Sequence, residues 1–120
     1  MSDAAQVAIE REAAAYVRDA KFYYEWEGDQ DGPFDEAASA VAYVTAHPQS
    51  TLRPYLDVFV LHRYRCAFEA AGWEAAHGKT AEMTDAQGAA KHVADLSGQR
   101  RAASLYRELY RDLWDRVSGG

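Results

Sequence analysis

The sequence predicts an all-α protein, arranged as a four-helix antiparallel bundle or as stacked, repeat-like helical hairpins with the third helix central. Alanine is abundant while valine, isoleucine and threonine are sparse, which favours helix because alanine loses no side-chain entropy there. Apolar residues recur at steps of three and four in four segments, and each segment is bounded by capping residues, glycine or proline. The 120 residues suit a single domain, 1–120.

The first helix is expected to run from about Asp3 to about Trp26, with Ser2 or Asp3 as its N-cap. Its apolar stripe consists of Ala5, Ile9, Ala13, Tyr16, Ala20 and Tyr23. Two glycines and a proline in residues 28–33 predict a break before the next helix.

The second helix is expected to begin near Asp35 as its N-cap and to end before His47–Pro48. Its expected apolar residues are Ala38, Val41, Ala42 and Val44. For the third helix, Ser50 or Thr51 is the expected cap and Gly78 the end. Apolar side chains surround nearly its whole circumference, which predicts that it is the most buried element. They are Tyr55, Leu56, Val58, Phe59, Val60 and Leu61.

Thr84 and Gln87 match a capping box, which predicts that the last helix begins here. Two continuations stay open: an unbroken helix to about Val117, or a bend at Ser97–Gly98. The expected core stripe is Ala89, Val93, Leu96, Ala103, Tyr106, Tyr110, Leu113 and Val117.

The net charge of −6 is unevenly distributed along the chain: residues 1–50 carry −7 and residues 51–120 carry +1. An acidic first half argues against nucleic-acid binding, which needs a cationic surface. No apolar run is long enough to span a membrane, so no membrane association is expected. The single Cys66 and the absence of an apolar leader point to the cytoplasm.

A motif across residues 16–65 suggests one kind of binding surface. Aromatic residues at 23, 24 and 26 precede Gly28-Asp29, Asp35-Glu36-Ala37 opens the next helix, and Pro48 closes it. In this order the motif resembles a tetratricopeptide repeat. The resemblance implies a protein-binding surface, with these aromatics as candidate binding residues. The alternative is a plain helical hairpin. The aromatics are Tyr23, Tyr24 and Trp26.

The same turn carries alternating acids, and it resembles part of an EF-hand loop. Glycine for the sharp turn and hard oxygen ligands are what calcium sites require. The candidate metal ligands are Glu27, Asp29, Asp31 and Asp35. Calcium is the one cofactor that this pattern suggests. The alternative is a solvated acidic turn in which Asp35 caps the second helix.

His62 is the third candidate, because a cation, Arg65, follows it by three residues in a helix. This spacing resembles that of histidine phosphotransfer domains, and Cys66 stands where that family has glycine. The resemblance implies a phosphoacceptor role for His62. Because His62 shares a face with Phe59 and Trp73, the alternative is a buried, hydrogen-bonded histidine.

Aromatic residues are frequent, with eight tyrosines and three tryptophans, and most of them are expected in the core. Any aromatics that the core does not cover would mark a partner surface or a homodimer interface. The favoured interpretation is therefore an acidic adaptor, inhibitor or immunity-type module that binds another protein or itself. An enzyme is less favoured, because the histidines are scattered and general acid–base chemistry needs them gathered.

Overall fold

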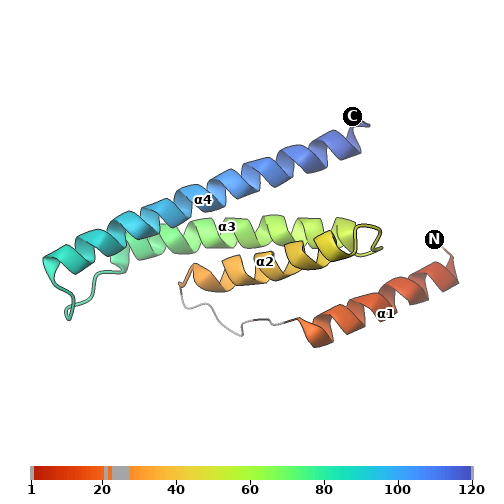
Figure 1. Ribbon diagram of the computed structural model, residues 1–120, viewed down its shortest axis with the longest axis horizontal. Helices are drawn as coiled ribbons and strands as arrows, with labels where there is room; N and C mark the ends of the chain where they lie inside the picture. The colour runs from red at the N-terminus through yellow and green to blue at the C-terminus, as the bar shows by residue number, and fades with distance from the viewer. Residues whose placement is uncertain (1, 21, 23–27, 120) are drawn as a thin grey trace.

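The computed structural model describes residues 2–20, 22 and 28–119, and this part of the chain contains four helices and no strand (Figure 1). They are α1 (Asp3–Asp19), α2 (Asp31–Ala46), α3 (Arg53–His77) and α4 (Asp85–Val117). The all-α prediction is confirmed. The radius of gyration is 17.5 Å, against about 14 Å for a compact chain of this length. The helices therefore leave more of their sides uncovered than a closed bundle would.

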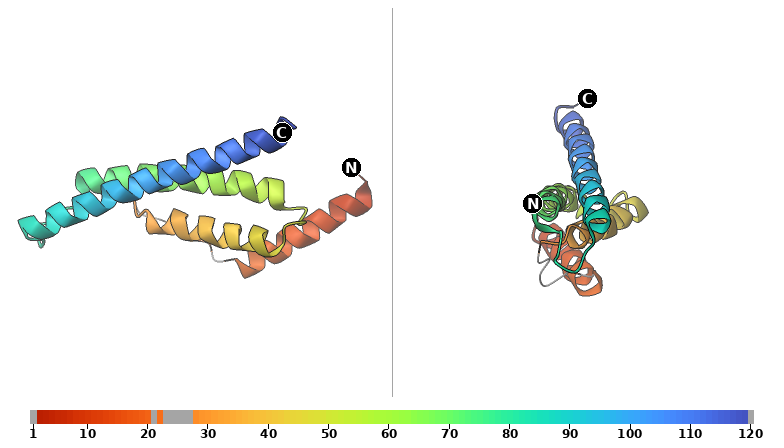
Figure 2. Two further views of the ribbon diagram at one scale, coloured as in Figure 1. Left: turned by 45° about the horizontal axis from the view of Figure 1, so that its top comes forward. Right: turned by 90° about the vertical axis from the view of Figure 1, so that its left-hand side faces the viewer.

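α3 is the central helix, as predicted, because it packs against both α2 and α4. Short connections make α2–α3 and α3–α4 antiparallel hairpins. Seen end-on, α4 and α1 lie on opposite sides of the α2–α3 pair (Figures 1 and 2). A consequence is that α4 does not close a ring with α1.

α1 is shorter than predicted. Its Ser2 cap is confirmed, since Ser2 Oγ accepts the Ala5 N–H at 3.1 Å. The helix ends at Asp19 rather than near Trp26, because Ala20 is already extended (φ −75°, ψ 148°). The next described ring, Phe22, packs edge-on against Phe59 of α3 at 5.9 Å. This tertiary contact outweighs the local helix propensity.

α2 begins at Asp31, four residues before the predicted Asp35, so Asp35 lies inside the helix and is not its cap. Gly32 and Pro33 are tolerated because the first helical turn has no use for an internal N–H donor. Carboxylates accept hydrogen bonds from the backbone N–H groups at the start of the helix. Glu74 Oε1 accepts the Gln30 N–H at 2.8 Å. The predicted end before Pro48 is confirmed by the last residue, Ala46.

The N-cap of α3 lies one or two residues after the predicted ones. Leu52 is the N-cap residue, so the prediction of Ser50 or Thr51 is wrong, although Ser50 Oγ accepts the Leu52 N–H at 3.1 Å. The helix ends at His77 before Gly78, as predicted. The prediction that apolar side chains are buried around nearly the whole circumference of α3 is wrong, however, because Tyr55 and Val58 are 59% and 62% exposed.

α4 opens on the predicted capping box: Gln87 N–H donates to Thr84 Oγ1 at 3.1 Å, and Thr84 N–H donates to Gln87 Oε1 at 2.8 Å. Of the two continuations, the unbroken helix is the one observed. Gly98 does not bend the helix; instead, its lack of a side chain leaves room for Gln30. The Gln30 carboxamide lies so close to it that a Cβ could not fit without displacing that side chain.

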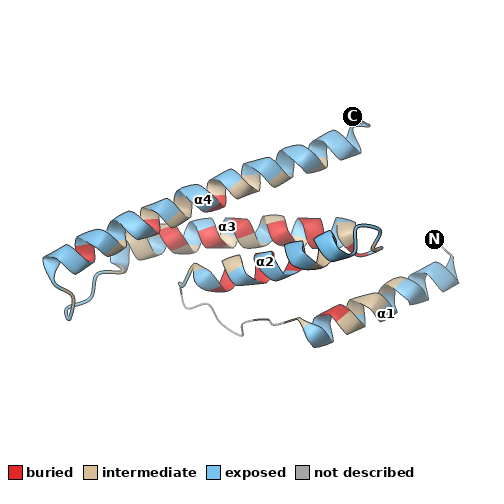
Figure 3. Ribbon diagram, viewed as in Figure 1, coloured by how far each residue is buried: buried red, intermediate tan, exposed pale blue. Residues whose placement is uncertain are grey.

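Buried positions lie on all four helices (Figure 3). The predicted Tyr16, Leu56 and Val60 are in the core, whereas the fully buried apolar residues of α2 and α4 are small and differ from most of the predicted stripe. In α2 the buried alanines are Ala37 and Ala40, while the predicted Ala38, Val41 and Ala42 are exposed. The buried positions of α4 are Gly88, Asp95 and Ala102. Small side chains allow the helix axes to approach closely. The buried carboxylates, Glu36, Asp57 and Asp95, have cationic or amide partners.

Those partners tie the helices at three places. Glu36 of α2, with a side chain only 1% exposed, accepts from Arg63 Nε at 2.8 Å. Arg116 of α4 donates to Asp57 Oδ2 at 3.1 Å. At the other end of α4, Lys91 Nζ lies 3.3 Å from Glu74 Oε2 of α3 and 2.7 Å from Asp95 Oδ2 of its own helix. Buried charges of this kind are tolerated only when paired.

Candidate interaction face

One apolar stripe of α4 faces solvent. Tyr106 is partly buried, but Tyr110, Trp114 and Val117 are 54%, 63% and 82% exposed. Steps of three and four place these side chains on adjoining positions of the helix surface. The Tyr106 and Tyr110 rings stack with centroids 6.2 Å apart and planes 12° apart. The aromatic excess in the sequence is therefore partly a surface feature.

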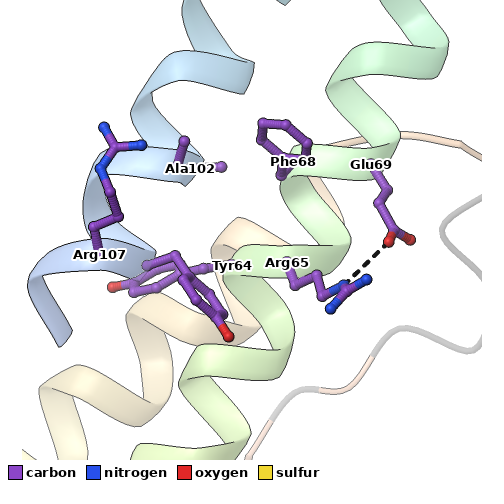
Figure 4. A pocket seen from close by; sticks show the side chains of 8 residues that line it. Tyr64, Arg65, Phe68, Glu69, Ala102 and Arg107 are labelled. Atoms are coloured by element: carbon purple, nitrogen blue, oxygen red, sulfur yellow. Dashed lines mark hydrogen bonds and ion pairs between the residues drawn. The ribbon is translucent and has the colours of Figure 1, made fainter. Parts of the chain in front are cut away.

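A groove runs beside this stripe, between α3 and α4 (Figure 4). Its volume is about 350 Å³. A second hollow shares Tyr106 and Arg107 with it and extends it to Tyr110 and Arg111. The lining side chains are Tyr64, Arg65, Phe68, Glu69, Ala102, Ala103, Tyr106 and Arg107. We call the two hollows together the α3/α4 groove.

Cations border this groove. Arg65 Nε pairs with Glu69 at 3.3 Å, and both side chains are well exposed, so this pair adds little stability. Arg107 and Arg111 form no ion pair or hydrogen bond with any residue that the structure describes. The apolar floor is thus bordered by two uncompensated guanidinium groups.

The opposite flank of the α3–α4 pair is filled by α2. Arg101 of α4 lies over the Phe34 ring at 4.6 Å. Gln30 Nε2 donates to Asp95 Oδ1 at 3.2 Å. On α3, Arg63 meets Glu36 and also covers the Phe59 ring at 4.2 Å. One flank of the pair is covered by a helix, and the other is open.

α1 is attached to the α2–α3 hairpin on the far side from the groove. Tyr16 packs edge-on against Tyr43 at 5.0 Å. Glu12 accepts hydrogen bonds from the hydroxyls of Ser50, Thr51 and Tyr43 at 2.8, 3.0 and 3.1 Å. The Ser50 hydrogen bond is the largest of the causes that lower the pKa of Glu12. This carboxylate therefore acts as a charged anchor for α1.

His62 is exposed, so the prediction of a buried core histidine is wrong. It lies on the solvent side of α3 with Tyr55 and Val58. Arg63 Nη1 donates to His62 Nδ1 at 2.7 Å, and Cys66 Sγ lies 3.7 Å from the ring. Burial raises the pKa of the Cys66 thiol, which keeps it protonated and weakly nucleophilic at neutral pH.

The acidic turn does not have the expected loop form in its described part. Asp31 and Asp35 belong to α2, and Asp29 Oδ1 accepts the Asp31 N–H at 2.8 Å. Burial, followed by the charges of Asp29 and Asp35, raises the pKa of Asp31. Among the described residues, no three histidine, cysteine or acidic side chains are grouped as metal ligands. The fourth candidate ligand, Glu27, lies outside the described residues.

Of the predicted binding residues, Arg65 lines the groove and His62 lies one turn away on the same helix. Tyr23, Tyr24 and Trp26 lie outside the described residues. The sequence interpretation did not identify the main groove residues, because it assigned the tyrosines among them to the core stripe and none of the others to a site. The available signal was an apolar stripe on α4 beside a second, small-residue stripe. The missed residues are Phe68, Tyr106, Arg107, Tyr110 and Arg111.

Comparison with family models, curated proteins and solved structures finds no match. In the part of the chain that the structure describes, α1 ends at Asp19 and α2 begins at Asp31. In the described ranges, no helix combines the length and apolarity needed to cross a bilayer. The argument for function therefore rests on the open face of α3 and α4.

Proposed function

We propose that this chain is a protein-interaction module that binds a partner protein through the exposed apolar side of α4. The observation that supports this proposal is the exposure of Tyr110 and Trp114, two large aromatic side chains on one side of α4 that the core does not cover. Association would remove this apolar surface from water, which is favourable. Tyrosine, tryptophan and arginine are also the residue types that dominate binding energy in interfaces.

Affinity capture with matched variants tests the proposal. A Tyr110→Glu, Trp114→Glu double variant places charge on the stripe, and a Val7→Glu, Val17→Glu variant does the same on exposed positions of α1. We expect a stoichiometric partner on the wild-type protein and on the α1 variant, and its loss from the α4 variant. Sedimentation velocity identifies the partner as a second copy if the wild-type protein dimerises. Failure to capture any partner, or capture that ignores the α4 variant, contradicts the proposal.

A histidine phosphotransfer role is the second candidate, and the exposure of His62 favours it. Arg65 lies three residues further along the helix and would face the transferred phosphoryl group with its guanidinium. Cys66 adds a side chain where a phosphotransfer partner needs room. Incubation with acetyl phosphate tests this role: an acid-labile phosphoryl group on the wild-type protein, absent from His62→Gln, supports it. No label on the wild-type protein excludes His62 as the acceptor under these conditions.

A further inference from the structure

We propose that the α3/α4 groove receives an amphipathic helix of a different protein, whose apolar stripe is flanked by carboxylates. This inference rests on the proposed interaction function and specifies its site and partner chemistry. Its basis is the arrangement of Phe68, Tyr106, Arg107, Tyr110 and Arg111 along one flank of the α3–α4 pair.

The shape of the site matches a helix. The groove lies between two antiparallel helices and is continued along α4 by the Tyr106–Tyr110 hollow. A helix lying there would contact side chains at steps of three and four along α4, the spacing by which helices interlock. The protein already shows such packing on the other flank, where α2 lies against the same two helices.

The floor of the groove is apolar where such a helix would place its stripe. Phe68 is 40% exposed on the α3 wall. Ala103 is a small residue between Phe68 and the tyrosines on the α4 wall, which leaves space for an incoming side chain. The stacked Tyr106 and Tyr110 rings supply flat contact surface at low entropic cost.

The charges select an acidic partner. Arg107 and Arg111 border the groove and lack an ion-pair partner among the described residues. On the closed flank the same problem is solved by α2, which brings Glu36 to Arg63 at 2.8 Å. A partner helix with glutamates beside its apolar stripe would neutralise the two free arginines in the same way. Charge complementarity of this kind sets partner choice and association rate.

The charges also argue against a second copy of this chain as the occupant. Antiparallel two-fold pairing of α4 centred on Tyr106 and Tyr110 would bring Arg107 next to its symmetry mate. Like charges placed opposite one another disfavour an interface. A homodimer through this groove would therefore need an anion between the two copies.

Two synthetic helical peptides of about 20 residues test the inference. Both carry the same leucine stripe, and the flanking positions are glutamate in one and lysine in the other. Fluorescence anisotropy with the full chain should show binding of the glutamate peptide at least about tenfold tighter than that of the lysine peptide, weakening with added salt. An Arg107→Glu, Arg111→Glu variant should reverse this preference. Phe68→Ala should weaken both peptides.

Several outcomes overturn the inference. Equal binding of the two peptides, no binding of the glutamate peptide at about millimolar concentration, or a preference unchanged by the charge reversal each do so. A wild-type dimer that dissociates in the Arg107→Glu, Arg111→Glu variant also does so, because the occupant is then a second copy. If a captured partner is lost in the Tyr110→Glu, Trp114→Glu variant while the peptide preference ignores charge, the interaction function stands and only the groove assignment fails.

Discussion

The buried flank of α4 carries small and acidic side chains, whereas its exposed flank carries large aromatic ones. The flank that packs against α3 and α2 carries Gly88, Asp95 and Ala102, whereas the flank that faces solvent carries Tyr110 and Trp114. Burial on the closed flank depends on small size and on a partner for each carboxylate. Apolar surface on the open flank is left over from folding, and it is therefore available for binding.

The largest expected difference between the flanks comes from adding volume at neighbouring alanines. Ala102 is fully buried, so Ala102→Phe should lower the free energy of unfolding by about 3 kcal/mol through overpacking. Ala103 also lines the groove but, unlike Ala102, it is only partly buried, so Ala103→Phe should change this free energy by less than about 0.5 kcal/mol. Urea denaturation measures both. Equal losses in the two variants would mean that the open flank is as tightly packed as the closed one.

Charge burial on the closed flank should give the next largest effect. Asp95 is 5% exposed and accepts from both Gln30 Nε2 and Lys91 Nζ. Asp95→Ala should therefore cost about 2 kcal/mol of unfolding free energy, because it leaves the part-buried Gln30 amide without its acceptor and leaves Lys91 with only its longer contact to Glu74. Asp112→Ala, at an exposed position of the same helix, is the matched control and should be near neutral. A near-neutral Asp95→Ala would show that the pairing does not stabilise this end of α4.

The sequence was informative where local rules decide the structure. The Thr84–Gln87 capping box, the stop before Pro48 and the central position of the third helix were all predictable from local signals. The rotation of the buried face of α2 was not. It depends on Glu36 finding Arg63 on another helix, and hydropathy cannot reveal such a partner.

The candidate site was predictable only in part, for the same reason. The sequence shows the apolar stripe through Tyr106 and Tyr110, but a second stripe of small residues beside it competes for the core. Which stripe is buried follows from how closely the axes approach at Ala67 and Ala102, both fully buried. The exposure of His62 likewise depends on which side of α3 the neighbouring helices cover. The predicted aromatic site at residues 23, 24 and 26 lies outside the described residues.

On the closed side of the molecule, α1 is attached through a polar contact, the carboxylate of Glu12. Glu12→Gln should cost about 1 kcal/mol of unfolding free energy, since one neutral acceptor replaces a carboxylate that serves three hydroxyls. The folded protein holds the pKa of Glu12 below its ordinary value. Its contribution is therefore complete above the unfolded-state carboxyl pKa and is lost as the pH falls through the lower, folded value.

Hydrogen exchange of the α1 amides, followed from neutral to acidic pH, measures this anchor separately from the rest of the protein. Protection of α1 should fall with pH in the wild-type protein before protection of α3 does. Glu10→Gln is the control, because Glu10 is exposed and accepts its hydrogen bond from Gln6 of the same helix. If α1 in the Glu12→Gln variant keeps the wild-type pH dependence, another group must hold it.

The smallest expected effect on stability is also the most informative about function. Tyr110→Ala removes a side chain that is 54% exposed, so the free energy of unfolding should change by less than about 0.5 kcal/mol. Part of even this change comes from losing the stack on Tyr106. Binding of a partner should fall by about tenfold or more, because truncating a tyrosine at the centre of an interface typically costs above about 1 kcal/mol. A variant that folds as well as the wild-type protein but binds its partner less tightly would show that the open flank serves binding and the closed flank serves stability. Loss of stability comparable to that of Ala102→Phe would instead place Tyr110 in the core and leave α4 without an open flank.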